Sequence, residues 1–184
     1  MSDFRVSHRY ATSLLETALE KMNLEKVSAD VLFLVKVLEE NRKLVSMLES
    51  PVIRPELKLN VLKEIFEKRI SKESTDFIEF VVSKKRENLI LSIGKRFLEL
   101  RDEHLGIANV AVTTATEFTD DQRKVLQTRL ESILKKKVRL SFKIDLNLVG
   151  GFIAKVSDTL YDASIKHQLD LLRKQFLTGE YSLN

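Results

Sequence analysis

The chain of 184 residues contains 43% hydrophobic and 32% charged residues, with 31 Lys and Arg against 27 Asp and Glu. This length and balance allow one medium domain or two small ones, each with a packed core and a charged surface. The lack of cysteine excludes disulfides and thiolate chemistry, and a formal charge of +4 is too mild to indicate a concentrated phosphate-binding surface.

Apolar residues recur at helical spacing through the first 105 residues. Pro55 suits the first turn of a helix because its missing N–H would be unsatisfied there anyway, and Ser71 suits the cap before another helix. Helical stripes fall within residues 11–22, 27–38, 55–66, 71–82 and 89–100. We count about six helices in this region, and their short connections favour antiparallel packing in a compact bundle.

The pattern changes at Gly106. Residues 107–114 are mostly β-branched or small and predict a strand, and Thr119 before two aspartates predicts a helix cap. Residues 138–144 alternate between apolar and polar side chains, which predicts a strand with one buried face. After a pair of glycines we expect a hairpin, with a strand over 152–156, a turn at Ser157 and Asp158, and a returning strand at Leu160 and Tyr161. A final helix should follow, with Asp162 and Ser164 as N-caps. Its apolar face consists of Ile165, Leu169, Leu172 and Phe176.

These patterns together predict an α+β protein with two domains. The first is a six-helix bundle over residues 1–105, and the second is a small α/β domain over residues 106–184. The boundary is a switch of periodicity, because no low-complexity linker separates the two patterns.

Gly150 and Gly151 stand side by side between two strand-like segments. A phosphate-binding loop needs several glycines at fixed spacing directly before a helix. Here strand-like residues follow Gly151, without a third glycine at such spacing. We therefore expect a bulge or a tight entry into a hairpin, where the backbone would not tolerate a Cβ.

Candidates for nucleic-acid binding and catalysis are weak. The basic clusters at 84–86 and 135–137 fall at predicted helix ends, where cations favour the negative end of the helix dipole. Asp158 and Asp162 suit a turn and a helix cap, while His167 lies about one turn into the final helix. The three histidines of the chain lie far apart in sequence, without the spacing of a metal site. We expect no catalytic residue, no cofactor and no metal ion.

The sequence also lacks signals for membrane insertion and export. No apolar run approaches the roughly 20 residues that span a bilayer. The first twelve residues have neither the apolar core of a signal peptide nor the composition of a transit peptide. We expect a soluble protein that stays in a bacterial-type cytoplasm.

Two predicted helices carry more apolar surface than one core contact needs. In the first helix these residues are Tyr10, Ala11, Leu14 and Leu15, and in the helix after Ser71 they are Phe77, Phe80, Val81 and Val82. Ordinary core packing is one interpretation of both stripes. The other is a groove for a partner helix, since a small bundle cannot bury every side of every helix.

The segment KVRLSFKIDLNLVGGFIAKVSDTLYDASIKHQLDLL resembles the C-terminal signature of the δ subunit of F-type ATP synthase, called OSCP in mitochondria. The shared features are the alternating strand, the glycine pair, Asp158 in a turn, and Asp162 with Ser164 opening a helix. RYATSLLETALE is similar to the opening helix of that family, and SPVIRPELKLNVLKEIF to its middle. Lys84 and Lys85 depart from it, because relatives often show Asn and Gly there.

The resemblance implies a non-catalytic peripheral-stalk subunit that keeps the catalytic hexamer from turning with the rotor. The N-terminal bundle would bind the N-terminal helix of an α subunit between its first and fifth helices. The site residues so implied are Tyr10, Ala11, Leu14, Leu15, Phe77, Phe80 and Val81. The C-terminal domain would hold the C-terminal end of the b-subunit stalk. The chain would then be a monomer within a hetero-oligomeric complex, peripheral to the cytoplasmic face of the bacterial inner membrane and not inserted into it.

Two alternatives from other functional classes remain open at this point. A basic RNA- or ribosome-associated helical protein is suggested by the isoelectric point of about 9.2. A hydrolase using Asp158, Asp162 and His167 would need these groups to converge around a pocket.

Overall fold

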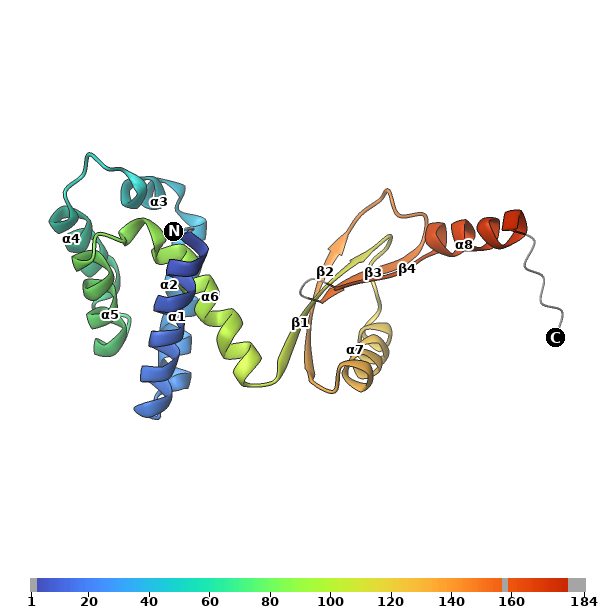
Figure 1. Ribbon diagram of the computed structural model, residues 1–184, viewed down its shortest axis with the longest axis horizontal. Coiled ribbons are helices and arrows are strands. Elements are labelled where there is room, and N and C mark those ends of the chain that lie inside the picture. Colours follow the sequence, from blue (N-terminus) through green and yellow to red (C-terminus); the bar gives the residue numbers. More distant parts are fainter. Residues whose placement is uncertain (1–2, 157–158, 179–184) are drawn as a thin grey trace. The chain divides into compact units, whose positions relative to one another are not determined.

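The computed structural model describes residues 3–156 and 159–178 and divides the chain into two compact units, Met1–His104 and Leu105–Asn184 (Figure 1). The division falls one residue before the boundary expected from the sequence. The predicted mixture of helices and a sheet is confirmed, with helices in the first unit and both helices and strands in the second.

The first unit is helical throughout its described elements. Pro55 occupies the first turn of its helix, as predicted from its missing N–H, and Ser71 is the N-cap residue of the helix that follows. The helices are α1 (Asp3–Glu20), α2 (Leu24–Glu40), α3 (Arg42–Glu49), α4 (Pro55–Phe66), α5 (Lys72–Ser83) and α6 (Ile90–His104), with a 3₁₀ turn η1 (Glu87–Leu89) before α6.

One hydrophobic core joins the helices of the first unit. Its fully buried large side chains include Phe66 of α4 and Phe97 of α6. Gly94 lets α6 approach α2 closely, because an added Cβ would lie 2.7 Å from Cγ2 of Val35. The helices therefore hold a fixed arrangement in which α1 and α5 share a core with α2 and α6.

A buried ion pair ties three further segments to this core. The Nζ of Lys58 on α4 lies 2.8 Å from Oε1 of Glu87 in η1 and donates to the carbonyl of Leu48 at 2.7 Å. Lys58 and Glu87 are both buried. The amine thus links the end of α3, the helix α4 and the turn before α6.

The second unit is a four-stranded sheet with one face covered by a helix. Its elements are β1 (Ile107–Thr114), α7 (Asp120–Leu134), β2 (Lys137–Ile144), β3 (Gly151–Val156), β4 (Thr159–Ser164) and α8 (Ile165–Thr178). The strand order is β2-β1-β3-β4, in which β1 pairs in parallel with β2 and antiparallel with β3, and β3 pairs antiparallel with β4. A small core of Val110, Val112, Leu126, Leu130, Val138 and Ala154 lies between the sheet and α7.

Local sequence signals set the ends of these elements. Thr119 forms a capping box with Gln122 at the start of α7, which confirms the predicted cap. Lys135 ends α7 in the left-handed conformation, with φ of 54°, so the basic cluster at 135–137 does lie at a helix end. Ser157 and Asp158, the predicted turn between β3 and β4, lie outside the described residues.

The glycine pair has a structural role in this unit. Gly151 has a φ of +79°, and a Cβ there would lie 2.3 Å from the carbonyl oxygen of Ala163 on the neighbouring strand. A Cβ on Gly150 would lie 2.6 Å from Cδ1 of Ile165. The pair therefore permits a tight entry into the β3–β4 hairpin, as expected, and strand β3 rather than a helix follows it.

Candidate functional site

A groove lies between α1 and α5, the two helices whose apolar stripes suggested a partner site. The rings of Tyr10 and Phe80 meet at a centroid distance of 6.1 Å, which brings the middle of α1 to the end of α5. Beyond this contact, residues within 13–18 of α1 and 73–80 of α5 line a groove of about 230 Å³. Its lining residues are Ser13, Leu14, Thr17, Ala18, Lys21, Asn23, Val27, Glu73, Asp76, Phe77 and Phe80.

The aliphatic residues of the predicted site belong to the core of the first unit, which corrects one expectation from the sequence. Ala11, Leu14, Leu15 and Val81 are buried in the first unit, so they are not surplus apolar surface. They face inward because the helical spacing that makes a stripe apolar also directs it at the core. Of the four, only Leu14 is also part of the groove lining.

Three aromatic residues of the predicted set stay accessible. Tyr10 and Phe77 are half-buried against the core, and Phe80 keeps 49% of its surface exposed. The aliphatic part of the surface is thus smaller than the sequence suggested, while the aromatic part remains. A site of this kind has an apolar centre over a rigid floor, which is the arrangement that produces binding hot spots.

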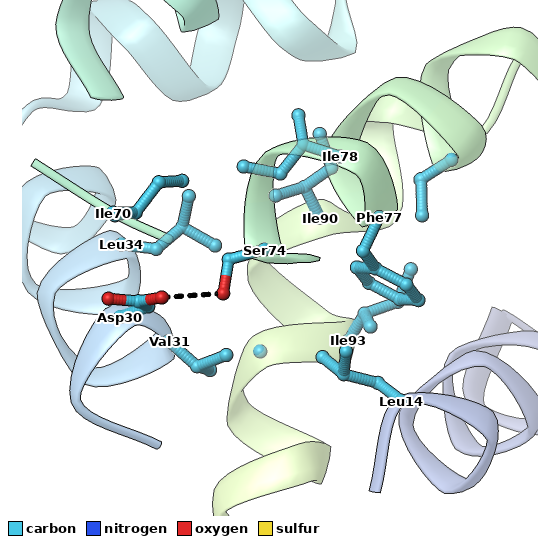
Figure 2. Close-up of a pocket in the computed structure, with 12 residues that line it drawn as sticks. Leu14, Asp30, Val31, Leu34, Ile70, Ser74, Phe77, Ile78, Ile90 and Ile93 are labelled. Atoms are coloured by element: carbon cyan, nitrogen blue, oxygen red, sulfur yellow. Dashed lines mark hydrogen bonds between the residues drawn. The ribbon is translucent and has the colours of Figure 1, made fainter. Parts of the chain in front are cut away.

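The position of α5 is fixed by a buried carboxylate on another helix. Oδ2 of Asp30 on α2 accepts hydrogen bonds from the Ser71 N–H at 2.9 Å, from the Ser74 hydroxyl at 2.7 Å and from the Ser71 hydroxyl. Figure 2 shows the contact with Ser74 at the rim of a small apolar cavity of about 20 Å³. The Ser71 side chain therefore binds Asp30 and does not cap its own helix. Asp30 instead holds the N-cap residue itself, by its N–H and its hydroxyl, from across the core.

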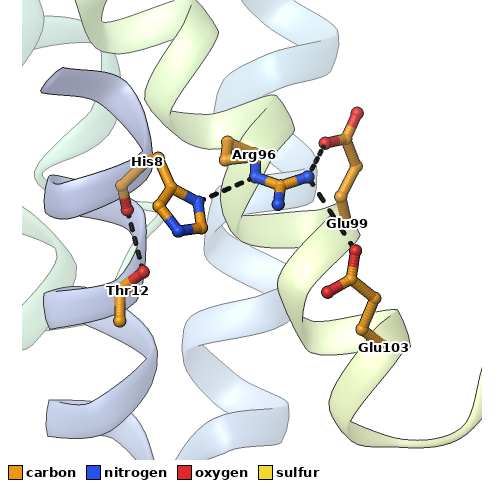
Figure 3. A network of polar contacts seen from close by, with 5 residues as sticks. All are labelled: His8, Thr12, Arg96, Glu99 and Glu103. Atoms are coloured by element: carbon orange, nitrogen blue, oxygen red, sulfur yellow. Dashed lines mark hydrogen bonds and ion pairs between the residues drawn. The ribbon is translucent and has the colours of Figure 1, made fainter. Parts of the chain in front are cut away.

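A second polar network holds α1 on α6. Nε of Arg96 donates to Nδ1 of His8 at 3.0 Å, and Nη1 of Arg96 pairs with Glu99 at 2.7 Å (Figure 3). The Arg96 guanidinium also lies 5.7 Å from the centre of the Phe4 ring. Both walls of the groove are thus anchored to the core helices by polar contacts as well as by packing.

The second unit holds the positions of the predicted family signature. Ser164 caps α8, because its hydroxyl accepts from the N–H of His167 at 3.2 Å. Asp162 lies in β4 and accepts from the N–H of Ser164 at 2.9 Å, so it supports the cap without forming it. Hydrogen bonds from the side chain and backbone of Ser164 lower the pKa of Asp162. Asp158 lies outside the described residues.

A hydrolytic site does not emerge from these residues. Asp162 serves the start of α8, and neither Asp162 nor His167 lines the α1–α5 groove or the small cavity beside Asp30. Over the same residues, no group of three His, Cys, Asp or Glu side chains is arranged to hold a metal ion. No helix in the described part of the chain is long and apolar enough to cross a membrane.

Comparison with known proteins identifies the family. The model of the ATP synthase delta (OSCP) subunit family matches residues 6–176. This chain belongs to that family. It is 38% identical to ATP synthase subunit delta of Chlorobaculum parvum over 177 residues, covering 96% of this chain and 98% of the relative. It is also 34% identical to ATP synthase subunit delta of Salinibacter ruber over 184 residues, covering 100% of this chain and 97% of the relative.

A solved structure agrees with the fold of this family member. A chain in the cryo-EM structure of the Toxoplasma gondii mitochondrial ATP synthase hexamer superposes with a TM-score of 0.75 and 20% identity, covering 93% of this chain and 97% of that chain. The resemblance inferred from the sequence is therefore confirmed, and the RNA- or ribosome-associated alternative receives no support.

Sequence reasoning missed the polar residues that build the groove. Asp30 was not singled out, because its hydrogen-bond partners lie 41 and 44 residues away in sequence. Glu73 and Asp76 give no local signal beyond that of acidic residues near a helix start. A periodic signal was present, since Glu73, Phe77 and Phe80 fall on one face of α5, but the sequence alone does not tell which helix lies opposite.

Proposed function

We propose that this chain is the non-catalytic peripheral-stalk subunit of an F-type ATP synthase, an accessory subunit without an active site of its own. The single observation that carries the proposal is the groove with an aromatic centre between α1 and α5 in a chain of the delta (OSCP) family. The closed six-helix bundle of the first unit supplies the rigid frame for it. The chain acts as one member of a larger assembly, held at the membrane through that assembly.

The groove would bind the N-terminal helix of an α subunit. A stator link must resist torque, so it depends on slow dissociation, which comes from a desolvated apolar centre ringed by polar contacts. Tyr10, Phe77 and Phe80 supply the centre, and Ser13 and Thr17 supply part of the polar rim. Leu14, Ala18 and Val27 are buried residues that also line the groove, and they form its apolar floor.

The second unit would hold the C-terminal end of the b-subunit stalk. Its helix α8 carries the predicted apolar face, and Leu169 and Leu172 on that face are exposed. Such a face needs a partner to cover it, because exposed apolar surface of this kind marks interaction sites. The two units together would connect the catalytic head to the stalk, the first through a groove and the second through a helix face.

The test uses two variants of the full chain that control for each other. In calorimetry with a peptide of the α-subunit N-terminus, Phe80→Asp should weaken binding by about 2 kcal/mol or more, in the hot-spot range. The same variant should still co-purify with b. Leu169→Asp combined with Leu172→Asp should lose b and keep the peptide.

A matched surface control is Leu32→Asp on α2. Leu32 is 50% exposed, almost the same as Phe80, and does not line the groove. It should leave the affinity for the peptide unchanged. Equal affinity of the wild-type chain and Phe80→Asp, with both folded by circular dichroism, would contradict the proposed groove.

A further inference from the structure

The two ends of the α1–α5 groove carry opposite charge. At the end formed by the last turn of α1 and the first turn of α5, the lining includes Glu73 and Asp76. Beside the other end, next to the lining residue Phe80 and outside the lining itself, Nζ of Lys84 lies 5.5 Å from the centre of the Phe80 ring, and the Arg9 guanidinium lies 5.7 Å from that of Tyr10. In the described part of the chain, none of these four charged residues forms an ion pair.

The acidic end also has an unused acceptor. Oδ1 of Asn23 is buried and has no hydrogen-bond partner among the described residues, and Asn23 lines the groove beside α1. Lys21 is the cation in this lining, so the two carboxylates exceed it by one charge. The two carboxylates and this amide oxygen belong to one groove lining, and such acceptors suit a group with several N–H donors, such as a guanidinium or an ammonium.

The spacing of these charges follows from the helix. Glu73, Phe77, Phe80 and Lys84 succeed one another by four, three and four residues and therefore lie on one face of α5 and its last turn. The eleven residue-to-residue steps from Glu73 to Lys84 cover roughly 16 Å along the axis, at about 1.5 Å per step. A partner helix that lies along α5 spans the same distance in about three turns.

We propose that the groove sets the direction of its bound helix by charge: the occupant is an amphipathic helix with a basic residue over Glu73 and Asp76 and an acidic residue about three turns away, beside Arg9 and Lys84. This inference rests on the proposed function, because the occupant is the α-subunit N-terminal helix. The aromatic centre supplies the affinity, while the charges at the two ends select one of the two directions in which a helix fits an elongated groove. Rim charges act in this way on register and association rate more than on affinity.

The test is a charge exchange in the full chain, with a synthetic peptide of the α-subunit N-terminus as the probe. The double variant Glu73→Lys and Asp76→Lys should weaken binding about tenfold, since two attractive contacts become repulsive. A peptide in which the facing basic residue is replaced by Glu should bind this variant better than it binds the wild-type chain. The exchange on both sides isolates the pairing from effects on each partner alone.

The matched control is Glu56→Lys with Glu64→Lys on α4. It changes the net charge equally, and Glu56 lies in the first turn of α4 as Glu73 does in that of α5. It should leave the affinity unchanged. Because lysine near a helix start can weaken the helix, a neutral variant, Glu73→Gln with Asp76→Asn, serves as a second measurement and should weaken binding about threefold.

The outcomes separate the two proposals. If the peptide binds the wild-type chain and both variants with equal affinity, the charge inference is overturned and the proposed groove stands. If the peptide does not bind the wild-type chain at all, both the charge inference and the proposed use of the groove are overturned. If the Lys variant binds the original peptide more weakly, and the peptide with Glu in place of the facing basic residue restores the affinity, both proposals are supported.

Discussion

The two units of this chain stabilise their shapes in different ways. The first unit buries charged groups among its helices, including Lys58 with Glu87 and Arg101 with Asp102. Among the described residues of the second unit, the buried side chains are apolar or hydroxyl-bearing and none is charged, and the backbone ladder of four strands defines the arrangement. Large apolar side chains such as Leu146, Val149 and Leu169 remain exposed in the second unit.

Because of this difference, the groove of the first unit is preformed. Buried polar contacts have strict geometry, so they fix the angles between helices more tightly than apolar packing alone. In the first unit they anchor α5 through Asp30 and tie α4 to η1 through Lys58, and the groove between α1 and α5 is thereby open without a partner. A preformed groove lowers the ordering cost of binding. Helix α8 is instead held at its start by Ser164 and Asp162, and its exposed apolar face is the surface for which we propose a partner.

The largest expected effect comes from breaking the buried pair of the first unit. Lys58→Met leaves Glu87 as an uncompensated buried charge and the Leu48 carbonyl without its donor. We expect the free energy of unfolding of the first unit to fall by about 3–5 kcal/mol. Urea unfolding followed by far-ultraviolet circular dichroism measures this loss, since most of the helix lies in the first unit.

The double variant Lys58→Met with Glu87→Leu is the control for that measurement. It removes both charges, so most of the stability should return, except for about 1 kcal/mol at the Leu48 carbonyl. Equal urea midpoints for the single and double variants would mean that an unpaired Glu87 carboxylate costs no stability. Burial of this ion pair would then not distinguish the first unit from the second.

The second unit should instead be most sensitive at its backbone. Gly151→Ala puts a Cβ against the Ala163 carbonyl at a φ of +79°, so we expect a loss of about 2–4 kcal/mol from the second unit alone. Gly106→Ala is the matched control, because Gly106 also has a positive φ, of +65°, but nothing lies within 4 Å of its Cβ position. That variant should cost about 1 kcal/mol.

Amide hydrogen exchange resolves the two units in this experiment. Faster exchange in β3 and β4 with unchanged exchange in α2 and α6 is the expected result for Gly151→Ala. Similar losses in the two glycine variants would show that positive φ alone, without the close approach of β4, accounts for the requirement at Gly151.

The sequence was sufficient for the elements that depend on local signals. Helical spacing, the proline at the start of α4 and the cap at Thr119 act within a few residues, and the structure confirms each of them. The strict alternation over 138–144 likewise matches β2, although only Val138 of its apolar side is fully buried. Helix α3 was not separately located, because its eight residues hold little more than two turns of pattern.

The site was predicted only in part, for a reason that the buried residues make clear. The apolar stripes pointed to α1 and α5, the helices between which the groove lies, but did not divide each stripe into core and surface. Leu14 and Val81 fall on the core side, while Phe80 falls on the open side. That division depends on the rotation of each helix about its axis. Long-range contacts such as Asp30 with Ser74 set this rotation, and they are not visible in a local pattern.

The smallest expected effect concerns a second carboxylate at a helix start and sharpens the contrast between the units. Asp30 supports α5 from the buried core, whereas Asp162 supports α8 through the adjacent Ser164. Hydrogen bonds from the Ser164 side chain and backbone lower the pKa of Asp162 below its ordinary value near 3.9. A folded pKa below the unfolded one means that this stabilisation is present above about pH 4 and is lost as the pH falls through the folded pKa.

A carboxyl-carbon NMR titration should therefore give Asp162 a depressed midpoint, and Ser164→Ala should move that midpoint upward. A midpoint that is unchanged by Ser164→Ala would show that the start of α8 does not depend on this contact, and α8 would then rely on its binding partner alone.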